Sequence, residues 1–258
     1  MGNEYVMMNV KLPAGTSYVR TEVTEEGLKI FCVDTAESIV NNTESIEAAT
    51  QKDDVFRWID VTEIKKYDFG EKREDEYEEE LRQNILNARE NYTSKGFYAP
   101  IYEPSLDADG NIQFVAGATP AVGHSAVWWN EKGAEFCPER DSSQGTDEEY
   151  YLFIGYLIKE GHLAWEQAAF DSRSVGNYRD SPNSPKAIEK TGTRSCGGFY
   201  GFVGNTFKYV KRAKASGYEL MGGSCYVEGG NFPVGDACTF YYSDRVFNFS
   251  VGWLVLHK

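Results

Sequence analysis

The 258-residue sequence lacks several features that define familiar classes of protein. No run of 18 apolar residues occurs, so we expect no transmembrane helix and no membrane insertion. The first residues, MGNEYVMMNVKLPAG, have neither the basic start nor the apolar stretch of a signal peptide. Positive charge is scarce, because 26 basic residues face 40 acidic ones and leave a net charge of −14. Such a field repels phosphate, so nucleic acid is not an expected partner.

Metal-binding and redox motifs are also missing. The three histidines are far apart in the sequence, and the five cysteines form no CxxC pair. A zinc site needs such ligands at close spacing, so we expect no metal and no cofactor. The Asp107–Gly110 stretch indicates a hairpin turn, and the further ligands of a calcium loop do not follow it. Free and mostly buried thiols are expected at Cys32, Cys137, Cys196, Cys225 and Cys238.

Acidic and aromatic residues are what the sequence has in excess. Residues 1–100 hold 21 acidic and 12 basic residues, so this part of the chain carries most of the negative charge. Tyr, Phe and Trp together make up 14% of the chain. This content favours either β-rich architecture or an aromatic binding surface.

Local patterns predict a mixed α+β fold. The best helix covers 71–93, which contains no Gly or Pro and repeats apolar residues every three or four positions. Its apolar stripe packs either on its own domain or, alternatively, on sister subunits. Further expected elements are strands at 18–23, 28–33, 111–115 and 247–255, helices at 130–137, 147–159 and 164–170, and a long loop at 171–195.

Several stretches of the C-terminal part occur in the order found in one known family. They are VWWNEKGAEFC (127–137), WEQAA (165–169), GFYGFVGNTFKY (198–209) and GGS (222–224), followed by Arg245 and VGW (251–253). Together they resemble the C-type-lectin-like domain of formylglycine-generating enzymes and of the variable proteins of diversity-generating retroelements. The sequence departs from that pattern at Phe202 and Lys208, where the family has Asp and Glu, and at Tyr209, Cys225 and Trp253.

The resemblance implies the fold and the division of the chain. Residues 96–258 are expected to form a C-type-lectin-like ligand-binding domain of the formylglycine-generating-enzyme type. Residues 1–95 are expected to form a smaller β-rich region, with one amphipathic helix, for attachment or oligomerisation.

The cysteine spacing argues against the enzymes of that family. Their cysteine pair lies three and eight residues beyond the Ser of Gly-Gly-Ser. Here Cys225 lies one residue beyond Ser224 and Cys238 fourteen beyond, with no basic residue between them. A reactive thiolate needs neighbours that lower its pKa, so we expect no catalytic residues and no enzyme.

The 225–250 segment has the composition of a binding surface. Aromatic residues lie there among Gly, Ser, Asn and Asp, a mixture that combines large contact area with adaptable hydrogen bonding. In the resembled variable proteins this region is rewritten by mutagenesis. The alternative is that the aromatics build a sheet core, which the alternation favours for Phe247 and Phe249. Expected ligand contacts are Cys225, Tyr226, Glu228, Asn231, Phe232, Asp236, Tyr241, Tyr242 and Asn248.

These features lead to one hypothesis and three alternatives. The hypothesis is a phage or prophage receptor-binding protein, made in the host cytoplasm and located on the tail or surface of the virion. Its partners would be a host cell-surface receptor, protein or glycan, other virion or tail proteins, and two further copies in a homotrimer. The alternatives are a structural virion protein, a bacterial surface lectin and, with least support, a formylglycine-generating-type oxidase.

Overall fold

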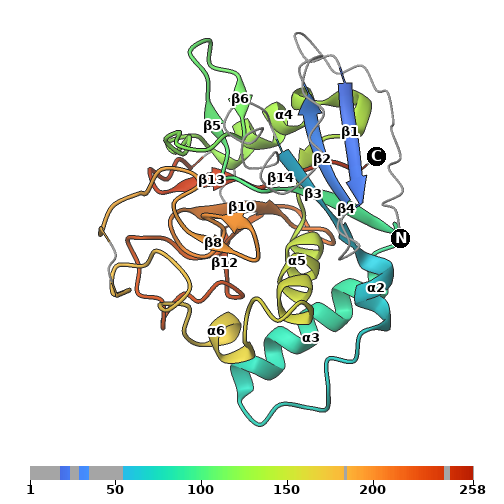
Figure 1. Ribbon diagram of the computed structural model, residues 1–258. Helices are drawn as coiled ribbons and strands as arrows, with labels where there is room; N and C mark the ends of the chain where they lie inside the picture. Colours follow the sequence, from blue (N-terminus) through green and yellow to red (C-terminus); the bar gives the residue numbers. More distant parts are fainter. Residues whose placement is uncertain (1–17, 24–28, 35–54, 183–184, 241–244, 258) are drawn as a thin grey trace.

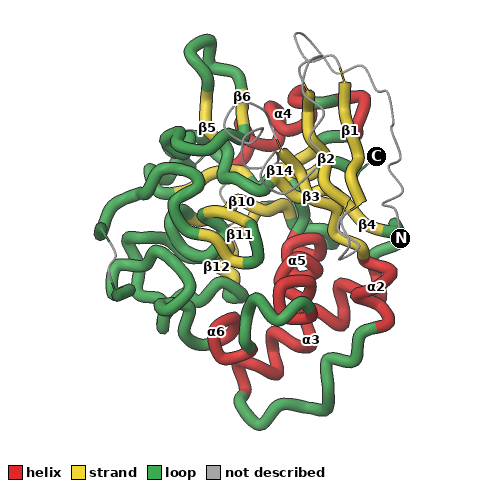
Figure 2. The backbone as a smooth tube through the Cα atoms, in the orientation of Figure 1, coloured by secondary structure: helices red, strands yellow, loops and turns green. Residues whose placement is uncertain are grey.

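The chain folds into a mixed α+β structure in which two four-stranded sheets are joined by helices and long loops (Figures 1 and 2). The computed structural model describes residues 18–23, 29–34, 55–182, 185–240 and 245–257. Within these residues no helix combines the length and the apolarity needed to cross a bilayer.

The N-terminal sheet is antiparallel and has the order β1-β2-β3-β4. It confirms the strands expected near 18–23 and 28–33. Its last strand pairs with the third across residues 61–95, which contain two helices. The strands are β1 (Tyr18–Val23), β2 (Lys29–Asp34), β3 (Val55–Asp60) and β4 (Gly96–Pro100).

The second sheet has the order β12-β11-β10-β13, with β13 parallel to β10 and the other pairs antiparallel. Three two-stranded ladders flank it. The strands of the sheet are β10 (Phe207–Lys211), β11 (Tyr218–Met221), β12 (Ala237–Phe240) and β13 (Ser250–Gly252), and those of the ladders are β5 (Ser105–Leu106), β6 (Ile112–Gln113), β7 (Ser143–Gln144), β8 (Ser195–Cys196), β9 (Phe199–Tyr200) and β14 (Leu254–Val255).

Helices α2 to α6 have clear sequence causes. The expected helix at 147–159 is confirmed, and its first turn closes with a capping box between Thr146 and Glu149. The expected helix at 130–137 begins earlier, because Ser125 caps it at the Trp128 backbone N–H. The helices are α2 (Val61–Lys66), α3 (Glu76–Asn91), α4 (Ala126–Phe136), α5 (Asp147–Lys159) and α6 (Trp165–Ala169), with a short 3₁₀ helix, η1, at Pro138–Arg140.

Helix α5 lies at the centre of the molecule and α3 packs across it (Figure 1). Gly155 allows this close approach, because a Cβ there would lie 2.9 Å from the Ile85 methyl carbon. Ile85 and Leu81 of α3 are buried, so the predicted stripe packs on its own chain. Tyr77, at the start of the same stripe, is 53% exposed.

One core crosses the expected boundary between residues 95 and 96. Ile59, Ile85 and Trp253 belong to the same buried cluster, and β3 on one side of the boundary pairs with β4 on the other. Residues 55–95 therefore share their core with the C-terminal part of the chain, and the boundary does not fall at a break in the packing.

Two further expectations concern short elements. The hairpin at 105–113 is confirmed, and the Asp107 carboxylate accepts hydrogen bonds from the backbone N–H groups of Asp109 and Asn111, which explains the turn. The strand expected over 247–255 instead divides into β13 and β14. The division lies at Trp253, whose indole is fully buried against α5.

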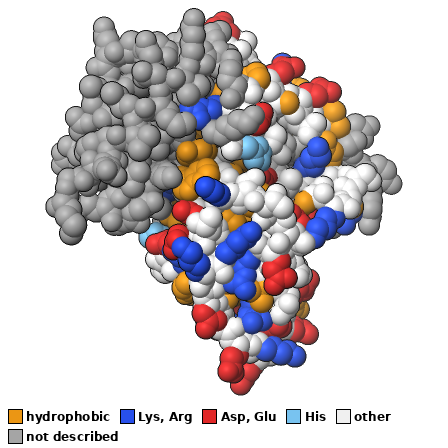
Figure 3. Space-filling model, turned by 90° about the vertical axis from the view of Figure 1, so that its right-hand side faces the viewer, with side chains coloured by type: hydrophobic (Ala, Val, Ile, Leu, Met, Phe, Trp, Pro, Cys, Tyr) orange, Lys and Arg blue, Asp and Glu red, His pale blue; other side chains and the backbone are white. Residues whose placement is uncertain are grey.

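On one face of the molecule the charge is mixed rather than uniformly acidic. Figure 3 views the side that carries α2 and α3, where Lys and Arg side chains gather between Asp and Glu. Two of the cations form ion pairs within their own helix, Lys66 with Glu63 and Arg82 with Glu79. The excess of acid in the N-terminal part of the sequence therefore does not make this face uniformly negative.

Candidate ligand-binding surface

Two glycines turn the chain after β11. Gly222 and Gly223 have φ values of 87° and 64°, a left-handed conformation that other residues rarely adopt. A Cβ on Gly223 would lie 2.3 Å from the Tyr178 ring and 2.6 Å from the Phe232 carbonyl oxygen. The following loop therefore passes directly over Tyr178, and only glycine fits beneath Phe232.

A buried ion pair supports this turn from inside. Lys208 Nζ lies 2.8 Å from Glu103 Oε1, and both side chains are completely buried. Glu103 also accepts hydrogen bonds from the Asn205 amide and the Thr206 hydroxyl, both at 2.5 Å. Burial raises the pKa of Glu103 and lowers that of Lys208, while their mutual attraction opposes both changes. The lysine that departs from the family pattern thus has a buried partner that sequence reasoning missed.

Polar contacts pin the 225–236 loop to the preceding 171–181 loop. The Glu228 carboxylate pairs with Arg179 at 2.6 Å and accepts a hydrogen bond from the Asn231 amide at 2.9 Å. The Gly229 backbone N–H donates to Asp180 at 2.9 Å. Glu228, expected as a ligand contact, therefore holds the loop in place.

Four aromatic side chains in or near this loop are linked to one another directly or through the buried ring of Phe207, and we call Tyr226, Phe232, Phe247 and Phe249 the aromatic row. Phe249 is 6.0 Å from Tyr226 and 5.4 Å from Phe247 between ring centroids. Tyr226 is 48% exposed, and the three Phe rings are half-buried against the core. The buried ring of Phe207 supports both Phe232 and Phe249 from below, at 6.0 and 5.9 Å.

Exposed residues lie beside the aromatic row. The Arg245 guanidinium lies 4.9 Å above the Phe247 ring, and Val246 is 50% exposed. Val246 also bridges to Ser125, the N-cap of α4, which anchors this segment. Asn248 is exposed beside Gly123.

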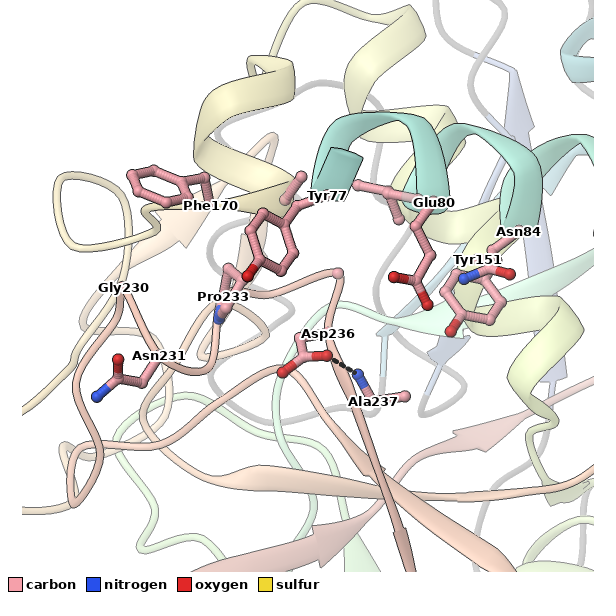
Figure 4. Close-up of a pocket in the computed structure, with 13 residues that line it drawn as sticks. Tyr77, Glu80, Asn84, Tyr151, Phe170, Gly230, Asn231, Pro233, Asp236 and Ala237 are labelled. Atoms are coloured by element: carbon pink, nitrogen blue, oxygen red, sulfur yellow. Dashed lines mark hydrogen bonds between the residues drawn. The ribbon is translucent and has the colours of Figure 1, made fainter. Parts of the chain in front are cut away.

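A pocket of about 480 Å³ opens on the other side of the 225–236 loop (Figure 4). Its walls come from α3, α5, α6 and the 230–237 segment, which lie far apart in the sequence. We call it the acidic pocket, and its principal side chains are Tyr77, Glu80, Tyr151, Phe170, Asn231 and Asp236.

The pocket has a negative electrostatic character. The pKa of Asp236 is raised, first by burial of its carboxyl against the pocket wall and then by the nearby charge of Glu80. The backbone N–H of Ala237, 2.9 Å from the carboxylate, partly offsets this. Burial also raises the pKa of the Tyr151 phenol, and the surrounding carboxylates add to the effect.

The expectation that Cys225 contacts a ligand is wrong. It is 1% exposed, so it is not a surface contact, and burial raises the pKa of its thiol to about 12. The reason is the glycine turn, which places Cys225 beneath the loop, where its backbone N–H bonds the Asn205 carbonyl at 3.0 Å. Cys137 and Cys196 are likewise buried, as expected.

The other expected contact residues fall into four groups. Tyr226, Phe232 and Asn248 lie in or beside the aromatic row, and Asn231 and Asp236 line the acidic pocket. Glu228 bridges between the loops, as described above. Tyr241 and Tyr242 lie outside the described residues.

Sequence reasoning missed the α3 and α6 side of the pocket. Tyr77 and Phe170, with rings 6.4 Å apart, are exposed by 53% and 49%. Tyr77 belonged to the apolar stripe of α3, and only its position in the first turn of the helix indicated that it could extend past the core. Glu80 is one of many acids in that helix and carried no signal of its own.

No group of three or more His, Cys, Asp or Glu in the described part of the chain is arranged to hold a metal ion. Comparisons with family models, curated proteins and solved structures find no match for the chain.

Proposed function

We propose that the chain is a non-enzymatic binding protein that presents the aromatic row to a receptor on a host cell. The single observation that carries the proposal is the row itself. Tyr226, Phe249 and Phe247 form a chain of ring contacts, Phe232 joins it through the buried Phe207 ring, and Tyr226 is half-exposed. Rigid aromatic side chains lose little conformational entropy on binding and dominate the energy of protein interfaces.

We also propose a C-type-lectin-like fold for the C-terminal part. The WEQAA stretch forms α6, and the Gly204-Asn205 turn is left-handed at both residues before β10 begins. The left-handed Gly222-Gly223 pair and the terminal strand β13 follow in the order of the resembled family. The positions of these turns and elements support the proposed fold.

The state of Cys225 favours binding over oxidase chemistry. Catalysis by cysteine requires the thiolate, and a buried thiol with a pKa near 12 is protonated at neutral pH. Cys225 therefore supports a structural role for the thiol in the segment that the resembled enzymes use for catalysis.

The proposed setting is a phage or prophage particle with the protein as a homotrimer on the tail or virion surface. The N-terminal part would attach it there, with residues 55–95 contributing to the common core. Three copies of one modest surface raise avidity without any new contact.

The test compares cell binding by Tyr226→Ser with binding by Tyr67→Ser, a control that also removes a partly exposed tyrosine. Fluorescently labelled full chains are incubated with a panel of bacterial strains and counted by flow cytometry. We expect a strain that binds the unmodified protein to bind Tyr226→Ser at least about tenfold more weakly, since a central aromatic contact is worth about 2 kcal/mol or more. The Tyr67→Ser variant should bind normally.

Equal binding by both variants would contradict the proposal. Changes in the aromatic row that alter particle assembly without changing adsorption would favour the alternative, a structural virion protein.

A further inference from the structure

We propose that the acidic pocket is a second binding site and that it takes a small organic cation, a primary ammonium on an aliphatic chain. This inference does not depend on the receptor proposal, because the pocket lies across the loop from the aromatic row and uses different side chains.

The first feature is the negative charge of the residues that line the pocket. Two carboxylates, Glu80 and Asp236, line the pocket, and no Lys, Arg or His is among its lining residues. The Glu80 carboxylate forms no ion pair or hydrogen bond with another described residue. In Figure 4 it points from α3 towards Tyr151 and Asp236. Each carboxylate disfavours the charge of the other, and a bound cation would relieve that repulsion.

The second feature is the chemistry of the walls. The rings of Tyr77 and Phe170 lie 6.4 Å apart at one end of the pocket, and the Tyr151 ring lies beside Glu80 towards the other end. Aromatic faces attract ammonium groups, and several such rings around one space are a recurring solution for organic cations. A bare metal ion would instead need more oxygen ligands than two carboxylates provide.

The third feature is an unused hydrogen-bonding group in the wall of the pocket. The Tyr151 side chain is partly buried and lines the pocket, and its hydroxyl makes no hydrogen bond to another described residue. The hydroxyl oxygen is therefore open to a ligand that donates a hydrogen bond to it. An ammonium group has three donors and suits an acceptor of this kind.

The fourth feature is the volume of the pocket. About 480 Å³ lies in the range of small-molecule sites. Leu81, Ala169 and Pro233 supply apolar surface for methylene groups between the polar ends. The pocket is therefore matched to a short aliphatic amine better than to a small inorganic ion.

The experiment titrates the full chain with 1,5-diaminopentane by isothermal calorimetry, with 1,5-pentanediol and calcium chloride as separate probes. The diol has the same length and no charge, and calcium has the charge without the chain. We expect saturable binding of the diamine alone. Glu80→Gln and Asp236→Asn should each weaken it by about tenfold, which corresponds to about 1.4 kcal/mol.

The matched control is Glu90→Gln, which removes an exposed charge from the same helix outside the pocket. It should change the affinity by less than about twofold. Tyr151→Phe should weaken binding while leaving the fold intact, as checked by thermal unfolding of every variant. Two carboxylate variants are used so that one remains informative if the other unfolds.

Three results would overturn the proposal: equal binding of the diol, equal weakening by Glu90→Gln, or no saturable binding of the diamine. Stronger binding of calcium than of the diamine would also overturn it. The Tyr226→Ser variant distinguishes the two proposals, because it should lose cell binding and keep the diamine site.

Discussion

At the scale of single residues, burial decides the chemistry of the charged groups. Lys208 and Glu103 are completely buried and satisfy each other, with Asn205 and Thr206 completing the shell of the carboxylate. Removal of one partner from such a pair leaves an uncompensated charge in the core, which costs far more than the pair contributes. The pair thus makes the glycine turn above it sensitive to a single substitution.

Substitution of Lys208 by Met tests this arrangement. We expect the free energy of unfolding at pH 7 to fall by about 3–5 kcal/mol. Without Lys208, burial raises the folded-state pKa of Glu103 further above its unfolded value. Stability linked to such a carboxyl is fully present below the unfolded pKa and is lost as the pH rises through the folded pKa. The deficit relative to the unmodified protein should therefore shrink at pH 4, as measured by urea unfolding.

The control is the double substitution Glu103→Gln with Lys208→Met, which removes both charges. It should recover much of the stability at pH 7. A double variant no more stable than the single one would show that the loss reflects packing and not charge.

At the scale of elements, backbone geometry decides where the candidate surface lies. β11 ends at Met221, and the left-handed Gly222 and Gly223 direct the chain over Tyr178. The same turn buries Cys225 and exposes Tyr226. Composition alone placed both residues in one surface, because it contains no information on which way each side chain points.

A pair of glycine substitutions tests the turn. Gly223→Ala should lower the free energy of unfolding by about 2 kcal/mol or more, because its φ of 64° is strained for alanine and its Cβ would meet Tyr178. Gly230→Ala, in the same loop, meets no atom within 4 Å and should change stability by less than about 0.5 kcal/mol. Urea unfolding of both variants is the measurement, and equal losses would refute the assigned role of the turn.

At the scale of the whole molecule, one core joins the two parts that the sequence suggested were separate. Ile59 and Ile85 from before residue 95 share a cluster with Trp253 from near the end of the chain. The acidic pocket depends on this shared core, because α3 forms one of its walls and the 230–237 segment forms the other. Truncation at residue 95 would therefore remove part of the core together with that wall.

The proposed trimer is a prediction at this scale. Closed cyclic symmetry is the usual form of a homo-oligomer, and multivalent display suits a receptor-binding role. We expect sedimentation velocity at micromolar concentration to give the mass of three chains. Because each chain carries a net charge of −14, association should strengthen as added salt screens the repulsion. A single-chain mass at all salt concentrations would contradict the trimer.

The sequence by itself determined the elements whose causes are local. The α3 stripe, the Thr146 cap of α5 and the Asp107 turn each depend on residues within a few positions of one another, and all three appear where expected. The α+β class follows from the same patterns.

Only the tertiary structure decided which distant residues meet. The pairing of Glu103 with Lys208, the burial of Cys225 and the acidic pocket between Glu80 and Asp236 join positions separated by many residues. Local periodicity cannot encode such contacts, because they depend on how helices and loops pack around a shared core. For that reason five of the nine expected contact residues lie at one of the two surfaces, while the opposite wall of the pocket was not foreseen.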